Sequence, residues 1–473
     1  MLFSTTTFIL IFLPIVIFLY YTFLKFGKTK VINNIILFVA SIIFYAWGEP
    51  YYVIIMLLSI IVNWWLGILI EKYKKDKIKS KAIIVLMLLF NLGNLVIFKY
   101  LGFFIENINN IFAINIYVPD IRLPIGISFF TFQAISYVID VYKNNAKVQK
   151  NLLNMGLYIS FFPQLIAGPI VRYKTISEQI ENRKESFKKF SQGVKCFIIG
   201  LAKKVLLSNS LAIVADFAFE SAPLNISILL AWLGIISYTL QIYFDFSGYS
   251  DMAIGLAKMF GFELEENFNY PYISKSVTEF WRRWHISLGT WFKDYVYIPL
   301  GGNRVSKKRL IFNLFIVWLL TGLWHGANWT FIVWGLFYFS ILIIEKITHL
   351  DKNESKNLII NILKHSYTIF LIIIGWVIFR SDNLTQSYEY IKSMIGVSQN
   401  PLYDGQTILY LKEYGVYIIL GIIFSIPFGK KLYSKIPCFI LKPTKIAVFV
   451  LMFIISTSYI IKGTYNPFIY FNF

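Results

Sequence analysis

Residues 310–344 read LIFNLFIVWLLTGLWHGANWTFIVWGLFYFSILII, and His325 is the only ionisable side chain in this run of 35 residues. A helix crosses the hydrocarbon core of a bilayer in about 20 apolar residues, so the run is too long for a single crossing. Gly322 and Gly326 suit a break within it. The run therefore predicts two membrane-spanning helices that meet near His325.

The rest of the sequence has the composition of a membrane protein with many helices. Of its 473 residues, 57% are hydrophobic and 15% are charged, whereas soluble domains average about 45–50% and about 25%. The apolar residues form continuous blocks rather than the alternating strands of about 10 residues that build a membrane barrel. We therefore expect an all-α polytopic protein with about 11–12 membrane crossings, consistent with helices of about 20 residues.

We expect the crossings at residues 8–24, 31–47, 52–70, 82–98, 124–142, 196–217, 226–244, the two halves of 310–344, 367–379, 414–428 and 446–461. Residues 158–173, YISFFPQLIAGPIVRY, are apolar, but Pro163, Gly168 and Pro169 interrupt them. This segment is better suited to a re-entrant or interfacial position, with its irregular backbone buried in protein. Residues 101–123 and 346–366 are expected to be loops, and residues 173–195 a charged cytoplasmic helix.

All these segments are expected to form one membrane-embedded domain, 1–473. It comprises N-terminal helices with the re-entrant segment (1–170), a core with both histidines of interest (171–345), and C-terminal helices with a tail (346–473). Residues 1–21 have no basic n-region and no small-residue cleavage site, so we interpret them as part of the first span rather than a signal peptide.

The formal net charge is +20, and its lysines gather in short loops such as residues 71–81, EKYKKDKIKSK. Basic loops face the cytoplasm, which predicts that both termini are extracytoplasmic. Anionic lipids or an anionic cofactor are then the expected partners, and nucleic acid is not. Cys196 and Cys438 lie far apart in no metal-ligand spacing.

A second histidine, His285, lies in FWRRWHISLGTWFKDY, residues 280–295. At 100° per residue, a helix here would place its aromatic residues on one face and its charged residues on the other, with His285 at the edge of the aromatic face. Such a helix could lie in the membrane interface as an anchor with snorkelling arginines. A titratable histidine on the buried side argues against a role as anchor alone.

An ionisable residue inside a membrane is costly to bury and is a functional candidate by default, which applies to His325. The alternative is a structural histidine that bonds a neighbouring helix. Trp324, Asn328 and Trp329 could supply hydrogen-bond donors beside it, whereas His349 and His365 are expected to be solvated loop residues.

Residues 243–255, YFDFSGYSDMAIG, place Asp245 and Asp251 at the end of an expected span, with Ser247, Tyr249 and Ser250 between them. Buried carboxylates must be paired or hydrogen-bonded. They either hold two helices together or orient a catalytic histidine. No cluster has metal-ligand spacing, so no metal site is expected. The motifs G-x-S-x-G, GxxxxGK[ST] and GxGxxG are absent from the sequence.

Three stretches resemble the membrane-bound O-acyltransferase family, in particular its bacterial branch that acylates alginate, peptidoglycan or teichoic acid. They are YFDFSGYSDMAIGLAKMFGF, NFNYPYISKSVTEFWRRWHISLGTWFKDYVYIPLGGNR and TGLWHGANWTFIVWG. The opening FSTTTFILIFLPI, the segment FFPQLIAGPIVRY and the closing PFIYFNF are similar to the alginate-type members. The resemblance covers nearly the whole chain.

This resemblance implies a ring of helices around a central funnel, with His325 as the catalytic histidine and His285 as the second one. It also implies a cytoplasmic thioester donor, most simply acetyl-CoA, and no permanently bound cofactor. The acceptor would be a hydroxyl of an extracellular glycan, reached through a secreted O-acetyltransferase partner. The alternatives are D-alanyl transfer to teichoic acid and a transporter or flippase, although a transporter would more often show repeats.

The residues themselves agree with acyl transfer. A hydroxyl that attacks a thioester needs a general base with a pKa near 7, which histidine provides. An anionic coenzyme suits a basic cytoplasmic mouth, for which Arg282, Arg283, Lys293 and Arg304 are available. Asp245, Ser247, Tyr249, Asp251, Trp324 and Asn328 are candidates to support the histidines. Tyr470 is the only hydroxyl in the closing PFIYFNF, and we expect it to carry the acyl group outward as a covalent relay.

Overall fold

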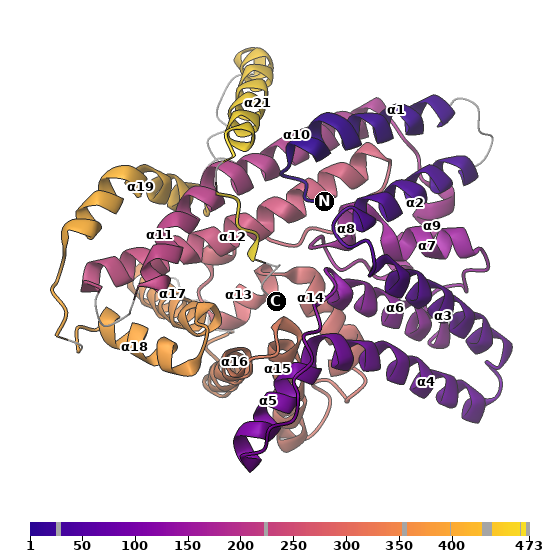
Figure 1. The fold of residues 1–473 in the computed structure, drawn as a ribbon, viewed down its shortest axis with the longest axis horizontal. Coiled ribbons are helices and arrows are strands. Elements are labelled where there is room, and N and C mark those ends of the chain that lie inside the picture. Colours follow the sequence, from indigo (N-terminus) through magenta and orange to yellow (C-terminus); the bar gives the residue numbers. More distant parts are fainter. Residues whose placement is uncertain are drawn as a thin grey trace. The chain divides into compact units, whose positions relative to one another are not determined.

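The computed structural model describes residues 1–24, 30–221, 226–351, 357–397, 399–427, 438–463 and 465–469. Every regular element in these ranges is a helix (Figure 1). The chain forms two compact units: Met1–Phe197 with Ser250–Glu265, and Ile198–Tyr249 with Glu266–Phe473.

The first unit contains α1 (Leu13–Leu24), α2 (Val31–Ala46), α3 (Val53–Lys72), α4 (Lys77–Leu95), α5 (Leu101–Phe112), α6 (Ile127–Tyr142), α7 (Leu152–Ser160), α8 (Phe162–Leu165), α9 (Tyr173–Asn182) and most of α10 (Phe187–Ala202). α6 packs on α3 and α4, and α2 packs on α7. The segment 158–173 is broken as expected, because α7 ends at Ser160 and α8 spans only four residues. Its residues 158–171 are all buried, which satisfies the requirement that irregular backbone in a membrane be covered by protein.

The second unit contains α11 (Asn209–Glu220), α13 (Val277–Arg283), α14 (Ile286–Phe292), α15 (Lys307–His325), α16 (Trp329–Thr348), α17 (Leu358–Arg380), α18 (Leu384–Met394), α19 (Gly405–Phe424) and α21 (Cys438–Ile461). The long helix α12 (Ile228–Met259) contributes to both units.

α15 and α16 form a helical hairpin that turns at His325, as the opening run of sequence predicts, but of these two helices only α16 is long and apolar enough to be a candidate span. α15 ends at His325, Gly326 follows in an extended conformation, and α16 begins at Trp329. The two helices touch backbone to backbone: a Cβ atom on Gly322 would lie 2.4 Å from the carbonyl oxygen of Phe331. Small residues at such contacts are typical of helices that pack within a membrane.

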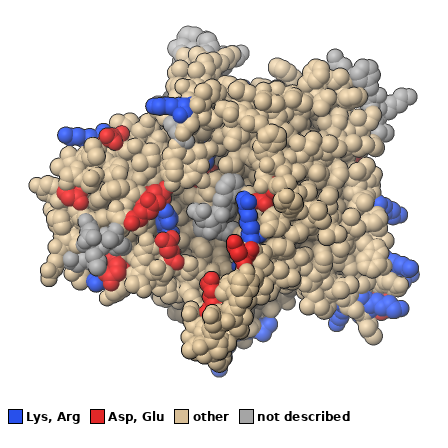
Figure 2. All heavy atoms as spheres, viewed as in Figure 1, with Lys and Arg blue, Asp and Glu red and all other residues tan. Residues whose placement is uncertain are grey.

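Within the described residues, seven helices are long and apolar enough to cross a membrane, and four shorter apolar helices accompany them. Large apolar side chains such as Phe18, Leu89 and Ile111 are more than two thirds exposed. Figure 2 shows a face on which neutral residues dominate and charged residues form scattered groups. A bilayer, rather than water, is the solvent that suits this surface.

Three predictions about element boundaries are wrong. Residues 101–112 form α5 rather than a loop. Residues 358–366 already belong to α17, so His365 is helical, and its Nδ1 lies 3.0 Å from the carbonyl oxygen of Ser274. α12 does not end before Asp245 but continues to Met259. In α12 the polar side chains of residues 245–250 are buried, so packing supports the continuation of this helix beyond the apolar run.

Candidate active site

His285 lies between α13 and α14, where the predicted continuous helix over residues 280–295 is wrong. Trp284 is extended, and His285 has a φ of 47°, in the left-handed region that a residue with a side chain seldom adopts. Asn267 explains the break. Its Oδ1 accepts from the backbone N–H of Ser287 at 3.1 Å and from the Ser287 hydroxyl at 2.9 Å, so it satisfies donors at the start of α14.

The same Asn267 oxygen lies 3.2 Å from His285 Nδ1. Donation from Nδ1–H to this oxygen leaves Nε2 as an acceptor, and Nε2 has no hydrogen-bond partner among the described residues. Burial lowers the pKa of His285 to about 3, so the imidazole is neutral at physiological pH. Sequence reasoning did not single out Asn267, because a lone asparagine has no signature.

His325 is the last residue of α15, and its side chain is buried within a cage of aromatic rings. The ring centroids of Trp324, Trp334 and Phe379 each lie 5.0 Å from that of His325, and Phe331 lies at 6.4 Å. Asn328 has a different role from the expected one. Its Oδ1 accepts from the N–H of Thr330, and its Nδ2 donates to the carbonyl oxygen of Asp382, so it caps α16.

The two histidines line one cavity of about 200 Å³. Its other lining residues are Trp281, Trp284, Leu288, Gly289, Phe292, Lys293, Tyr297, Leu314, Val317, Trp318 and Thr321. The ring of Trp324 contacts both histidines, at 5.8 Å from His285 and 5.0 Å from His325. The cavity is smaller than the about 300–1,000 Å³ of most ligand sites, so it suits a small group.

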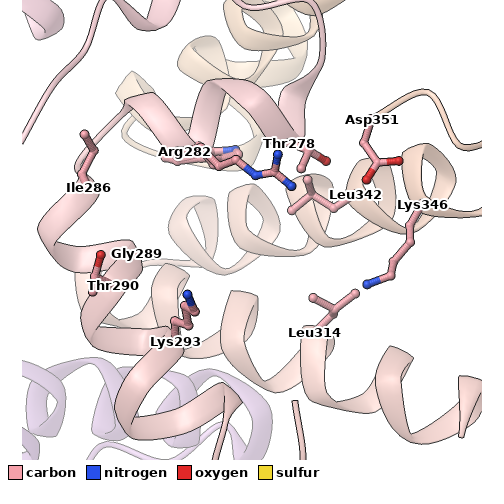
Figure 3. A pocket seen from close by; sticks show the side chains of 11 residues that line it. Thr278, Arg282, Ile286, Gly289, Thr290, Lys293, Leu314, Leu342, Lys346 and Asp351 are labelled. Carbon is pink, nitrogen blue, oxygen red and sulfur yellow. The ribbon is translucent and has the colours of Figure 1, made fainter. Parts of the chain in front are cut away.

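A second cavity, of about 410 Å³, shares Trp281, Gly289, Lys293 and Leu314 with the first. Figure 3 shows Arg282 from α13, Lys293 directly after α14 and Lys346 near the end of α16 around it. Among the described residues that line it, Asp351 is the one carboxylate. This set of donors has an excess of positive charge and fits an anionic ligand.

Two of the four predicted anion-binding residues are not brought to these cavities. Arg283 pairs with Glu279 at 2.9 Å and donates to the carbonyl oxygen of Asn269. Arg304 is exposed in the turn before α15 and lines neither cavity. Lys346 supplies a cation that sequence reasoning missed, because it follows directly on an apolar run and looks like its flank.

A third cavity, of about 590 Å³, touches the cage of His325 from another side. Phe331 and Phe379 line this cavity and also contact the His325 ring. The remaining lining comes from α11, α12, α17, the α16 N-terminus and the tail segment 465–469. His325 therefore lies between the small cavity and this larger one.

The first carboxylate of the YFDFSGYSD motif, Asp245, has partners other than a histidine. Asp245 forms a buried ion pair with Lys204 at 2.6 Å, and its Oδ2 accepts from the backbone N–H of Ile469 at 3.0 Å. Lys204 Nζ also donates to the carbonyl oxygen of Pro467. The ion pair thus connects α12 to the backbone of the C-terminal tail. None of these contacts supports the predicted role of Asp245 in orienting a histidine.

The other predicted site residues of this motif, Ser247, Tyr249 and Asp251, have different surroundings. Tyr249 packs its ring on Phe468 at 5.0 Å, which also connects α12 to the tail. Ser247 is buried, and its hydroxyl has no partner among the described residues. Asp251 belongs to the first unit, where its carbonyl oxygen accepts from Cys196 Sγ. Tyr470 lies outside the described residues.

Comparison with known proteins agrees with this arrangement. The profile of the MBOAT, membrane-bound O-acyltransferase family, matches residues 51–350. The probable alginate O-acetylase of Pseudomonas putida is 43% identical over 388 residues, which are 81% of this chain and 78% of that protein.

Two further relatives carry other names. The peptidoglycan O-acetyltransferase of Helicobacter pylori is 36% identical over 425 residues, 84% of this chain and 80% of its own. The teichoic acid D-alanyltransferase of Bacillus subtilis is 31% identical over 224 residues, 45% of this chain and 56% of its own. This chain therefore belongs to the membrane-bound O-acyltransferase family and is a multi-pass membrane acyltransferase.

Proposed function

We propose that this protein takes acetyl groups from acetyl-CoA in the cytoplasm and delivers them across the bacterial cytoplasmic membrane for O-acetylation of an extracellular glycan. The observation that carries the proposal is the arrangement of cavities, in which both histidines line a small cavity next to a cationic one. The relatives named as O-acetylating enzymes match more than four fifths of the chain, whereas the D-alanyl relative matches less than half.

The charges at the helix ends support the proposed orientation. α15 begins at Lys307, next to Lys308 and Arg309, and α16 ends beyond Lys346. Basic residues favour the cytoplasmic side, so the cationic cavity would open there. Arg282, Lys293 and Lys346 would then bind the phosphates of the donor, and the third cavity, near the opposite ends of these helices, would face outside.

The proposed chemistry is a transfer from a thioester to a hydroxyl. The hydroxyl oxygen forms a new bond to the acetyl carbonyl carbon while the carbon–sulfur bond breaks. His325 accepts the hydroxyl proton as general base and returns it to the leaving thiolate. His285 stays neutral and offers Nε2 as an acceptor that can orient a reacting hydroxyl. The small cavity favours an acetyl group over a long acyl chain.

A tail relay would solve the problem that donor and acceptor lie on opposite sides of the membrane. Lys204 and Asp245 hold the backbone of Pro467 and Ile469, and Tyr470 is the next residue in the chain. We propose that the Tyr470 hydroxyl receives the acetyl group and passes it to a secreted partner or to the glycan. Covalent relays of this kind divide one difficult step into two easier ones.

The test is incubation of the purified protein in detergent with acetyl-CoA labelled in its acetyl group. We expect label on the wild-type protein and none on His325→Ala or Tyr470→Phe. Tyr465→Phe is the matched control, because it removes a hydroxyl from the same tail. Label that persists in Tyr470→Phe would eliminate the relay. No acyl label on any variant, together with glycan movement across vesicles, would favour a transporter.

A further inference from the structure

The third cavity has the composition of a binding site in its own right. It is formed entirely within the second unit by the ends of α11, α16 and α17, the middle of α12 and the tail segment 465–469. Its volume of about 590 Å³ is in the range of small-ligand sites. Its aromatic walls include Phe331 and Phe379, the rings that separate it from His325.

Three buried polar atoms in its lining have no hydrogen-bond partner among the described residues. They are the hydroxyl of Tyr238, the Oε1 of Gln241 and the Oγ1 of Thr330. Each of these residues is at most 2% exposed. Buried polar groups in native proteins nearly always have partners, so three exceptions in one cavity require an explanation. Hydroxyl groups of a ligand could form hydrogen bonds with the two hydroxyls, of Tyr238 and Thr330, and donate to the amide oxygen of Gln241.

The charges of the lining are unbalanced. Among the described lining residues, Asp216, Glu220 and Asp382 contribute three carboxylates, against the single guanidinium of Arg380. Arg380 pairs with Asp216 at 2.7 Å, and Asp216 also accepts from the Tyr465 hydroxyl at 3.0 Å. The carboxylates of Glu220 and Asp382 therefore remain as an excess of negative charge. A ligand that carries its own carboxylate would be repelled.

We infer that this cavity binds the acetyl acceptor as an uncharged, polyhydroxylated sugar ring and selects against sugars with a carboxylate. The inference rests on the proposed function, because it treats the ligand as the acceptor. The aromatic walls provide apolar contact for a pyranose ring, and the unpartnered groups bond its hydroxyls. Alginate, the polymer for which several relatives are named, is a polyuronate, and an acidic lining disfavours such an acceptor.

The test is ligand binding to the full-length protein in detergent, measured by saturation-transfer NMR and calorimetry. The probes are neutral β-1,4-linked glucose oligosaccharides and mannuronate oligosaccharides of equal length. We expect the neutral series to bind more tightly at low salt, and the difference to shrink at high salt because charges are screened. Equal binding, tighter binding of the uronate, or no binding of either sugar would overturn the inference. If the cavity instead accepts a side chain of a partner protein, neither sugar should bind.

Two kinds of variant locate the binding to this cavity. Tyr238→Phe removes a hydroxyl and Thr330→Val replaces one with a methyl group, and both nearly keep the side-chain shape, so each should weaken neutral binding by about tenfold or more. Tyr45→Phe is the control, because Tyr45 also has a buried hydroxyl without a partner among the described residues, but in the first unit. Unchanged binding in both cavity variants would overturn the site.

The charge variant tests the selectivity. Glu220→Gln with Asp382→Asn should raise uronate affinity and leave neutral binding unchanged, whereas Glu413→Gln, on the exposed face of α19, should change neither. Persistent discrimination in the double variant would overturn the electrostatic argument. None of these measurements needs a donor, so the two failures are distinguishable. Neutral binding without acetyl transfer would refute the proposed function and the acceptor role of the sugar, but not the selectivity of the cavity for neutral sugars.

Discussion

At the scale of single residues, aromatic rings surround the His325 side chain and shield it from water. Trp324, Trp334 and Phe379 surround it at the boundary between two cavities. A base in such a place acts on a reacting hydroxyl without competition from bulk water. A substitution there should therefore affect the chemistry more than the fold.

His325→Asn should reduce acetyl transfer by about 10²–10⁴-fold, the usual contribution of a general base. His349→Asn applies the same change to an exposed histidine just beyond α16 and should have no effect. The measurement is acetyl transfer per mole of protein recovered in the membrane fraction. Near-normal transfer by the His325 variant would remove it from the mechanism.

Arg282 and Arg283 are neighbours in sequence with different environments, which makes them a matched pair. Arg282 lines the cationic cavity, whereas Arg283 is paired with Glu279. Arg282→Gln should raise the apparent KM for acetyl-CoA at least several-fold, most clearly at low salt where charges are least screened. Arg283→Gln should leave KM nearly unchanged. Equal effects in both variants would exclude a specific phosphate contact.

At the scale of elements, the α15–α16 hairpin positions His325 through glycine contacts. A methyl group at Gly322 would approach the carbonyl oxygen of Phe331 to 2.4 Å, so the helices would have to separate. Gly322→Ala should lower both the melting temperature and the transfer rate. Gly415→Ala in α19, where a Cβ meets nothing within 4 Å, should be neutral or slightly stabilising. Equal melting temperatures for the two variants would contradict this role of Gly322.

The buried ion pair between Lys204 and Asp245 holds the tail. Loss of one partner should cost more folding free energy here than in an exposed pair. Removing one partner of a buried pair typically costs about 3–5 kcal/mol, because the other charge is left uncompensated. Lys204→Met should therefore destabilise the protein more than the double variant Lys204→Met with Asp245→Leu. The measurement is thermal unfolding in detergent, with limited proteolysis of the tail.

The control for this pair is Glu389 and Lys392 on α18, 3.1 Å apart and more than a fifth exposed. Exposed pairs contribute about 0–1 kcal/mol, so Lys392→Met should change stability little. A double variant at Lys204 and Asp245 that is less stable than either single variant would show that the pair is favourable in itself. In that case, desolvation is not the dominant cost.

The elements also show which features could be predicted from sequence. The hairpin at His325 was predictable because a single run of 35 residues exceeds one crossing and contains glycines at the break. The break at His285 was not, because it depends on Asn267, which lies 18 residues earlier. The Lys204–Asp245 pair and its contacts with tail backbone join residues far apart in sequence, and no local pattern marks them.

At the scale of the whole molecule, the proposed function requires that the two ends of the hairpin face opposite sides of the membrane. Cysteine labelling tests this after Cys196→Ser and Cys438→Ser remove the natural thiols. His349→Cys and Asp382→Cys probe the second unit, and both positions are exposed. A membrane-impermeant maleimide should label Asp382→Cys in intact cells, but His349→Cys only after permeabilisation.

The first unit provides an independent pair, Ile78→Cys and Tyr117→Cys, at positions that are 81% and 80% exposed. The basic loop around Ile78 should be cytoplasmic and the loop at Tyr117 external, because lysines and arginines accumulate on the cytoplasmic side. If positions 349 and 382 were labelled from the same side, a cytoplasmic donor could not reach one cavity while an external acceptor entered the other. The transfer would then have to occur on one face of the membrane, and the relay through the tail would have no purpose.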